Sequence, residues 1–180
     1  MDLESTIYRW RVRAGLMGTV LAIILAQPTL PSFLAGLGIS SSGLLLRAWA
    51  SGYLKKEKEL TVSGPYRFTR NPLYLGNLII GIGMAAASCS WWVGGIFTAY
   101  FLLFYPLILK KEKEKMKSLF PKEYETYKNK VPFFFPHLRP PLPSKKNKFS
   151  WRIYQKNKEY RALVGTIIFW LFMAAKVLLF

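Results

Sequence analysis

The sequence predicts an all-α protein, a multi-pass membrane protein with about five transmembrane helices. Of the 180 residues 52% are hydrophobic, and they are gathered into blocks rather than spread along one face of amphipathic helices. The charged residues, which give a net charge of +17, lie between these blocks. A soluble domain this basic would suggest nucleic acid as a partner. The block pattern instead indicates membrane lipids as the partner, and no nucleic acid is expected.

A helix needs roughly 20 residues to cross the hydrocarbon core. The second, fourth and fifth apolar blocks are long enough, whereas the first and third are marginal and need flanking residues to span it. The first block is followed by Pro28 and Pro31 and lacks a clear small-residue cleavage site, so we interpret it as a retained span and not as a signal peptide. We expect the whole chain, residues 1–180, to form a single membrane domain. The expected spans are residues 12–28, 30–49, 72–89, 91–110 and 161–180.

The distribution of lysine and arginine predicts the orientation of these spans. The short links after the first and third spans carry no charge. Every lysine and arginine except Lys176 lies before Ala14, between Arg47 and Arg70, or between Lys110 and Arg161. The positive-inside rule therefore places the N-terminus and both charged segments, residues 50–71 and 111–160, in the cytoplasm, with the C-terminus on the outer side. Within the second segment, residues 136–143 are rich in proline and predicted to be extended, and residues 145–160 mix aromatic and basic side chains typical of an interfacial helix.

Cysteine and histidine are too scarce for the usual metal sites. The chain has one cysteine, Cys89, and one histidine, His137. These residues cannot form a disulfide within the chain or a cluster of thiolate or imidazole ligands. No metal is therefore expected.

The stretch "GPYRFTRNPLYLGN", residues 64–77, places a polar turn directly before the third span. Asn71 is a good helix N-cap and Pro72 suits the first helical position, so we expect the helix to begin here. Its unpaired N–H groups and positive dipole end would favour an anion, and Arg67 and Arg70 add positive charge. The alternative is that this turn only anchors a membrane helix at the cytoplasmic surface.

A second stretch, "KKEKEKMKSLFPKEYETYKNKVPFFFP" at residues 110–136, is expected to continue the fourth span's helix into the cytoplasm. Glu112 and Glu114 lie where that helix would leave the membrane, level with the start of the third span. An anion site and carboxylates at one height suit a zwitterionic ligand such as an amino acid head group. The alternative is that these carboxylates only pair with neighbouring lysines on a solvated helix.

The two stretches together resemble a family of integral-membrane methyltransferases, which includes isoprenylcysteine carboxyl methyltransferase and the phospholipid N-methyltransferases. The family pattern is roughly G-P-Y-x-x-x-R-H-P-x-Y-x-G, then a hairpin of spans, then E-E-x-x-L-x-x-x-F-G-x-x-Y-x-x-Y-x-x-x-V-P. The matching residues of the first motif are Gly64, Pro65, Tyr66, Arg70, Pro72, Tyr74 and Gly76. Those of the second are Glu112, Phe120, Tyr124, Tyr127, Val131 and Pro132.

The resemblance implies methyl transfer from S-adenosylmethionine, bound in a cytoplasmic pocket, to a lipophilic substrate that enters from the bilayer. It implies catalytic roles for Arg70 and Tyr74, with Arg70 holding a substrate carboxylate or a lipid phosphate. The residues that it assigns to the cofactor are Gly64, Pro65, Tyr66, Asn71, Pro72, Gly76, Glu112, Glu114 and Tyr124. Three positions depart from the family pattern: Asn71 replaces its histidine, Lys113 its second glutamate and Pro121 its glycine.

Several alternatives stay open at this point. We expect the methyl acceptor to be a carboxylate of an isoprenoid-like or lipid-like molecule, because a carboxylate needs no general base. A phospholipid amine is the alternative acceptor. Membrane sterol reductases have a similar turn, but Leu73-Tyr74 and Asn77 differ from their usual residues. Finally, Lys113 places a positive charge where the ligand's ammonium would be held, which suits a non-catalytic lipid-binding or scaffold protein.

Overall fold

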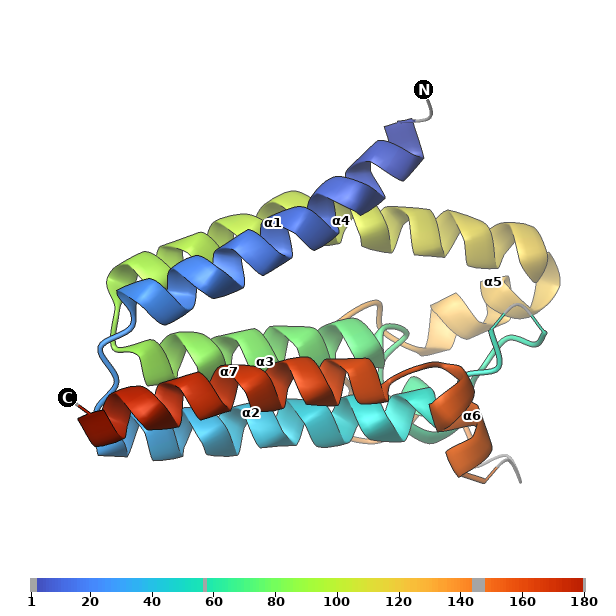
Figure 1. The fold of residues 1–180 in the computed structure, drawn as a ribbon. Helices are drawn as coiled ribbons and strands as arrows, with labels where there is room; N and C mark the ends of the chain where they lie inside the picture. The colour runs from blue at the N-terminus through green and yellow to red at the C-terminus, as the bar shows by residue number, and fades with distance from the viewer. Residues whose placement is uncertain (1–2, 57, 144–147, 180) are drawn as a thin grey trace. The chain divides into compact units, whose positions relative to one another are not determined.

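The computed structural model describes residues 3–56, 58–143 and 148–179, with the backbone alone for residues 3–9. All regular structure in these residues is helical, which confirms the predicted all-α class (Figure 1). The elements are α1 (Leu3–Leu25), α2 (Leu30–Ser51), η1 (Gly64–Arg67), α3 (Pro72–Ser88), α4 (Trp91–Leu119), α5 (Pro121–Lys130), α6 (Trp151–Lys156) and α7 (Tyr160–Leu179), where η1 is a single 3-10 turn.

Three of the described helices, α2, α4 and α7, are long and apolar enough to cross a membrane. A fourth, α3, is apolar but shorter, with 17 residues. These helices support an integral membrane protein. The expected number of about five spans, with α1 as the first, stays a prediction, as does the orientation.

Local sequence explains where the central helices begin and end. α3 starts at Pro72, as expected for proline at the first helical position. It ends before Cys89, whose φ of 47° is left-handed and cannot continue a helix. α4 runs for 29 residues without a break into the lysine-rich stretch, as the sequence predicts, although Pro106 lies inside it. Residues 131–143 form no helix or strand, in agreement with the proline-rich composition of their second half.

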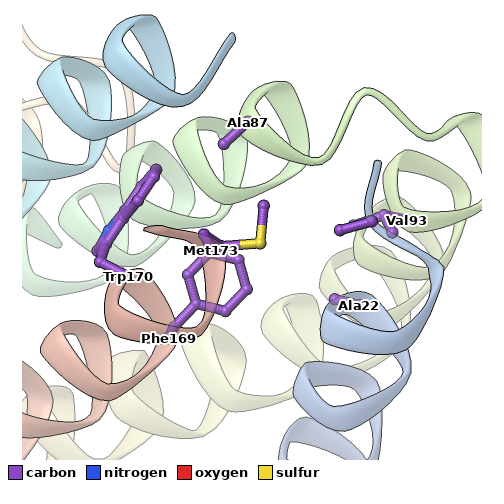
Figure 2. Close-up of a cluster of buried hydrophobic side chains, with 7 residues drawn as sticks. Ala22, Ala87, Val93, Phe169, Trp170 and Met173 are labelled. Atoms are coloured by element: carbon purple, nitrogen blue, oxygen red, sulfur yellow. The ribbon is translucent and has the colours of Figure 1, made fainter. Parts of the chain in front are cut away.

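The chain divides into two compact units, which we describe separately. Unit 1 comprises Met1–Ser41, Leu78–Ile108 and Val164–Phe180. Its core contains Phe169, Trp170 and Met173 of α7 together with small residues of α1 and α3 (Figure 2). α2 and α3 approach closely in this unit, because a Cβ atom added at Gly83 would lie only 2.6 Å from the carbonyl oxygen of Gly36. Ser40 Oγ also donates a hydrogen bond to the carbonyl of Ile80 over 3.1 Å.

Unit 2 comprises Ser42–Asn77 and Leu109–Leu163, and it contains both sequence motifs. Its core is formed by Tyr124, Tyr127 and Val131, which pack against partly buried apolar residues of the preceding segments. Four helices, α2, α3, α4 and α7, contribute residues to both units. The expectation of a single membrane domain over residues 1–180 stays a prediction.

Candidate functional site

The glycine-proline turn of the first motif folds as the 3-10 helix η1. Gly64 adopts a φ of 58°, which favours glycine, and a Cβ atom there would meet the ring of Tyr53 at 2.8 Å. Pro65 and Tyr66 follow and are buried. The turn therefore needs glycine for its backbone conformation and for the close contact with Tyr53.

The segment after α5 lies against the residues that precede α3. The backbone N–H of Arg70 donates to the carbonyl of Pro132 over 2.9 Å. Asn71 Nδ2 donates to the carbonyl of Phe133 over 2.8 Å, and Thr69 Oγ1 donates to that of Phe134 over 2.7 Å. The buried Asn71 side chain thus joins the end of the second motif to the start of α3. These bonds unite two segments that are about 60 residues apart in the sequence.

Two tyrosines of α5 connect the motifs a second time. The buried Tyr127 hydroxyl donates to the carbonyl of Tyr66 over 2.7 Å. Burial is the main reason that the pKa values of the Tyr66 and Tyr127 phenols lie well above their ordinary value, so these two hydroxyls stay protonated. The pKa of Tyr66 is raised further by Tyr127 and then by the negative charge of Glu112. Glu112 therefore adds negative potential beside the first motif.

Arg70 is the charged residue at the centre of this arrangement. Its Nη1 donates to the Tyr124 hydroxyl over 3.2 Å. Its guanidinium carbon lies 5.1 Å from the ring centre of Phe133 and 6.0 Å from that of Tyr124, within the range of cation–π attraction. Its Nε is buried and has no hydrogen-bond partner among the residues that the structure describes. A buried donor without a partner is costly, so this N–H is suited to an anionic ligand.

A pocket of about 400 Å³ opens beside Arg70. Its lining residues are Arg70, Lys113, Lys128, Asn129 and Phe133. Lys128 Nζ also contacts Glu125 Oε2 at 2.6 Å. The hydrogen bond from Lys128 is the main reason that the pKa of Glu125 is lowered, and the charges of Lys128, Lys117 and Lys113 contribute. The surroundings of the pocket are therefore positively charged.

The predicted site residues all lie in unit 2. Those that are buried are Pro65, Tyr66, Asn71, Pro72 and Tyr124. Tyr74 is half-buried in the first turn of α3. Gly76 is buried against α2, where a Cβ atom would lie 2.9 Å from the carbonyl oxygen of Gly43. Glu112 and Glu114 are exposed on α4 and do not line the pocket, whereas Lys113 does.

Sequence reasoning missed three lining residues, Lys128, Asn129 and Phe133. A signal for Lys128 was present, because it follows Tyr124 by four residues and so lies on the same face of α5. Asn129 and Phe133 carried no such signal, since the end of α5 and the turn after it decide where they lie.

The sequence also did not predict a buried ion pair in unit 2. Arg47 Nε lies 2.5 Å from Glu159 Oε1, and both side chains are largely buried. Arg47 Nη1 donates to the carbonyl of Leu73, and it also donates to Asn77 Oδ1. Arg47 thus joins the C-terminal part of α2 to the first two turns of α3 and to Glu159.

Comparisons with known proteins identify the same region. Residues 40–123 match a family model described as phospholipid methyltransferase. The match covers the first motif and the start of the second, and it confirms the resemblance to the integral-membrane methyltransferases. No solved structure matches the chain significantly.

Two curated relatives are similar over about half of this chain. The cobalt-zinc-cadmium resistance protein CzcN of Cupriavidus metallidurans is 36% identical over 94 residues, which are 51% of this chain and 43% of the relative. The nickel-cobalt-cadmium resistance protein NccN of Alcaligenes xylosoxydans xylosoxydans is 34% identical over 94 residues, 51% of this chain and 44% of the relative. The match thus spans less than half the length of either relative. Among the described residues of this chain, no group of three or more His, Cys, Asp and Glu residues is placed to hold a metal ion.

Proposed function

Because residues 40–123 match the phospholipid methyltransferase family, we propose that this chain transfers a methyl group from S-adenosylmethionine to a lipophilic acceptor at the membrane. The proposed acceptor is a carboxylate on an isoprenoid-like or lipid-like molecule. One observation carries the proposal: hydrogen bonds from Arg70 to Tyr124 and from Tyr127 to Tyr66 join the two motifs into one polar network.

The residues present fit the cofactor's charges. When bound, S-adenosylmethionine would supply a methyl group on a sulfonium for in-line displacement. Glu112, whose charge acts on Tyr66, would hold the ammonium, and the N–H groups in the first turn of α3 would hold the carboxylate. Tyr66, Tyr74 and Tyr124 provide aromatic faces that favour a sulfonium.

The acceptor would be held by the proposed catalytic residues Arg70 and Tyr74. The unpaired Nε of Arg70 favours an anionic group of the acceptor, and the half-buried Tyr74 would orient it. A carboxylate is already an anion at neutral pH, so it needs no general base. The position of His137 agrees with a reaction that needs no general base. This histidine is exposed, and its backbone N–H donates to the carbonyl of Phe68.

Phospholipid N-methylation is the second candidate, and the description of the matched family favours it. An amine acceptor must lose a proton before or during transfer, so a base would be required. None of the residues that line the pocket is a carboxylate or a histidine, which favours the carboxylate acceptor.

The test is to incubate the purified chain with methyl-labelled S-adenosylmethionine and a membrane extract, and then to separate the lipids. Treatment with base distinguishes the candidates, because a methyl ester releases labelled methanol whereas an N-methyl group does not. We expect base-labile label in a lipid fraction, and none with Arg70→Ala. Base-stable label would favour the N-methyltransferase. Absence of label together with absence of cofactor binding would leave a non-catalytic lipid-binding protein.

A further inference from the structure

The positive charge of the pocket beside Arg70 exceeds the single negative charge of one carboxylate. Three of its five lining residues, Arg70, Lys113 and Lys128, are cationic, and none is acidic. Of these three side chains, only Lys128 forms an ion pair with a carboxylate in the described part of the chain, that of the neighbouring Glu125. A zwitterionic head group would bring its ammonium close to two lysines, which is unfavourable. The charge of the pocket therefore favours a ligand with more than one negative charge.

The hydrogen-bond donors of the lining residues suit the oxygen atoms of a phosphate. The buried Nε of Arg70 has no partner among the described residues. The same guanidinium lies near the rings of Phe133 and Tyr124, and its Nη1 donates to the Tyr124 hydroxyl. An oriented guanidinium with a spare N–H is well suited to a phosphate oxygen. Asn129 can add an amide donor, while Lys113 and Lys128 can supply mobile ammonium donors.

The pocket is large enough to hold more than a phosphate group. Its volume of about 400 Å³ lies within the range of roughly 300–1,000 Å³ that is usual for small-molecule sites. The half-buried ring of Phe133 gives the pocket one apolar wall, suitable for the carbon atoms next to the phosphate.

We propose that the pocket formed by Arg70, Lys113, Lys128, Asn129 and Phe133 binds a phosphate monoester dianion, either as a lipid head group or as a small soluble phosphate. The inference deepens the proposed function, because the phosphate would be the anionic group that Arg70 holds, either on the acceptor or on a soluble ligand in its place. Phosphate binding itself does not depend on methyl transfer. It also gives Lys113 a role, since the lysine that replaces the family's glutamate becomes a ligand for the phosphate.

Calorimetric titration of the full-length purified protein tests this proposal. The probes are hexyl phosphate, inorganic phosphate, and hexanoate as a single-charge control with the same chain length. We expect hexyl phosphate to bind more tightly than hexanoate. Lys113→Glu and Lys128→Glu should each weaken it by about 10- to 100-fold, the effect of one charge-assisted hydrogen bond. Lys122→Glu, an exposed lysine of α5 outside the pocket, should leave binding unchanged.

The outcomes separate this site from the cofactor site. Tighter binding of hexyl phosphate than of inorganic phosphate would identify a lipid source, and equal binding a soluble one. Equal affinity for hexanoate and hexyl phosphate, or unchanged binding in both pocket variants, would overturn the inference. Loss of S-adenosylmethionine binding in Lys113→Glu would also overturn it, because the pocket would then belong to the cofactor. If the protein binds hexyl phosphate as expected but transfers no methyl group, the proposed function fails and this inference stands.

Discussion

Arg70 makes several kinds of contact at once. Its backbone N–H bonds Pro132, its Nη1 bonds Tyr124, its guanidinium faces aromatic rings, and its Nε is buried without a partner. Arg67, three residues earlier, differs: its Nε donates to the carbonyl of Leu142 over 2.8 Å, so its guanidinium already supports a loop. The two arginines of one turn therefore have separable functions.

Lysine should fail to replace Arg70. A lysine supplies charge, but it cannot donate to Tyr124 and to a ligand from the two edges of one planar group. We expect Arg70→Lys to lower methyl incorporation by about 10- to 100-fold, the effect of one charge-assisted hydrogen bond, with little change in the unfolding temperature. Arg67→Lys is the matched control and should retain most activity. Wild-type activity in Arg70→Lys would indicate that this turn serves only as a membrane anchor.

The two buried tyrosines of α5 should respond differently to loss of the hydroxyl. Tyr127→Phe leaves the buried carbonyl of Tyr66 without its donor, so it should cost about 1–3 kcal/mol in the free energy of unfolding. Tyr124→Phe removes only an acceptor for Arg70, which lines an open pocket and can turn to water or ligand. Tyr124→Phe should therefore lower methyl incorporation while changing the free energy of unfolding little.

Denaturant unfolding in detergent and methyl incorporation, measured on the same preparations, check this pair. Equal effects of Tyr124→Phe and Tyr127→Phe on both readouts would contradict the division between a ligand-orienting and a structural tyrosine.

Among the elements, the close approach of α2 and α3 in unit 1 depends on glycine. The carbonyl of Gly36 and the backbone nitrogen of Ser40 lie so near Gly83 that a Cβ atom there would be 2.6 Å and 2.7 Å from them. Both neighbours are backbone atoms of a helix and cannot turn away. Small residues at such positions let membrane helices pack closely.

Alanine at Gly83 should consequently destabilise the protein by about 1–3 kcal/mol, the usual cost of overpacking. Gly95→Ala in α4 is the matched control, because no atom of a neighbouring described residue lies within 4 Å of a Cβ atom there. That control should be neutral or more stable by about 0.5–1 kcal/mol, since alanine favours a helix over glycine. Thermal unfolding in detergent measures both variants, and a stable Gly83→Ala would show that α2 and α3 can separate without cost.

For the whole molecule, the segregation of charge along the chain predicts its orientation in the membrane. The link between α3 and α4 contains the exposed Cys89 and no charge, whereas the segment before α7 is strongly basic. The positive-inside rule places the former outside and the latter in the cytoplasm.

Cysteine labelling of intact cells tests this orientation. We expect a membrane-impermeant maleimide to label the native Cys89 from outside. Lys148→Cys, in a Cys89→Ser background, should be labelled only after the membrane is made permeable. Labelling of Lys148→Cys in intact cells would reverse the predicted sidedness.

The sequence by itself determined the helical class, the turn at Gly64 and the start of α3 at Pro72. It also determined that α4 continues into the charged stretch and which family the two motifs resemble. These features depend on local properties: apolar block length, the φ angle that glycine permits and the place of proline in the first helical turn.

Only the tertiary structure decided which charges face the pocket. Residues 112, 113 and 114 are neighbours on one helix, but successive side chains point about 100° apart, so the packing of α4 decides that Lys113 lines the pocket. Likewise, Arg47 and Glu159 are 112 residues apart, and the Asn71 side chain bonds Phe133. Such contacts join distant segments, and no local pattern in the sequence specifies them.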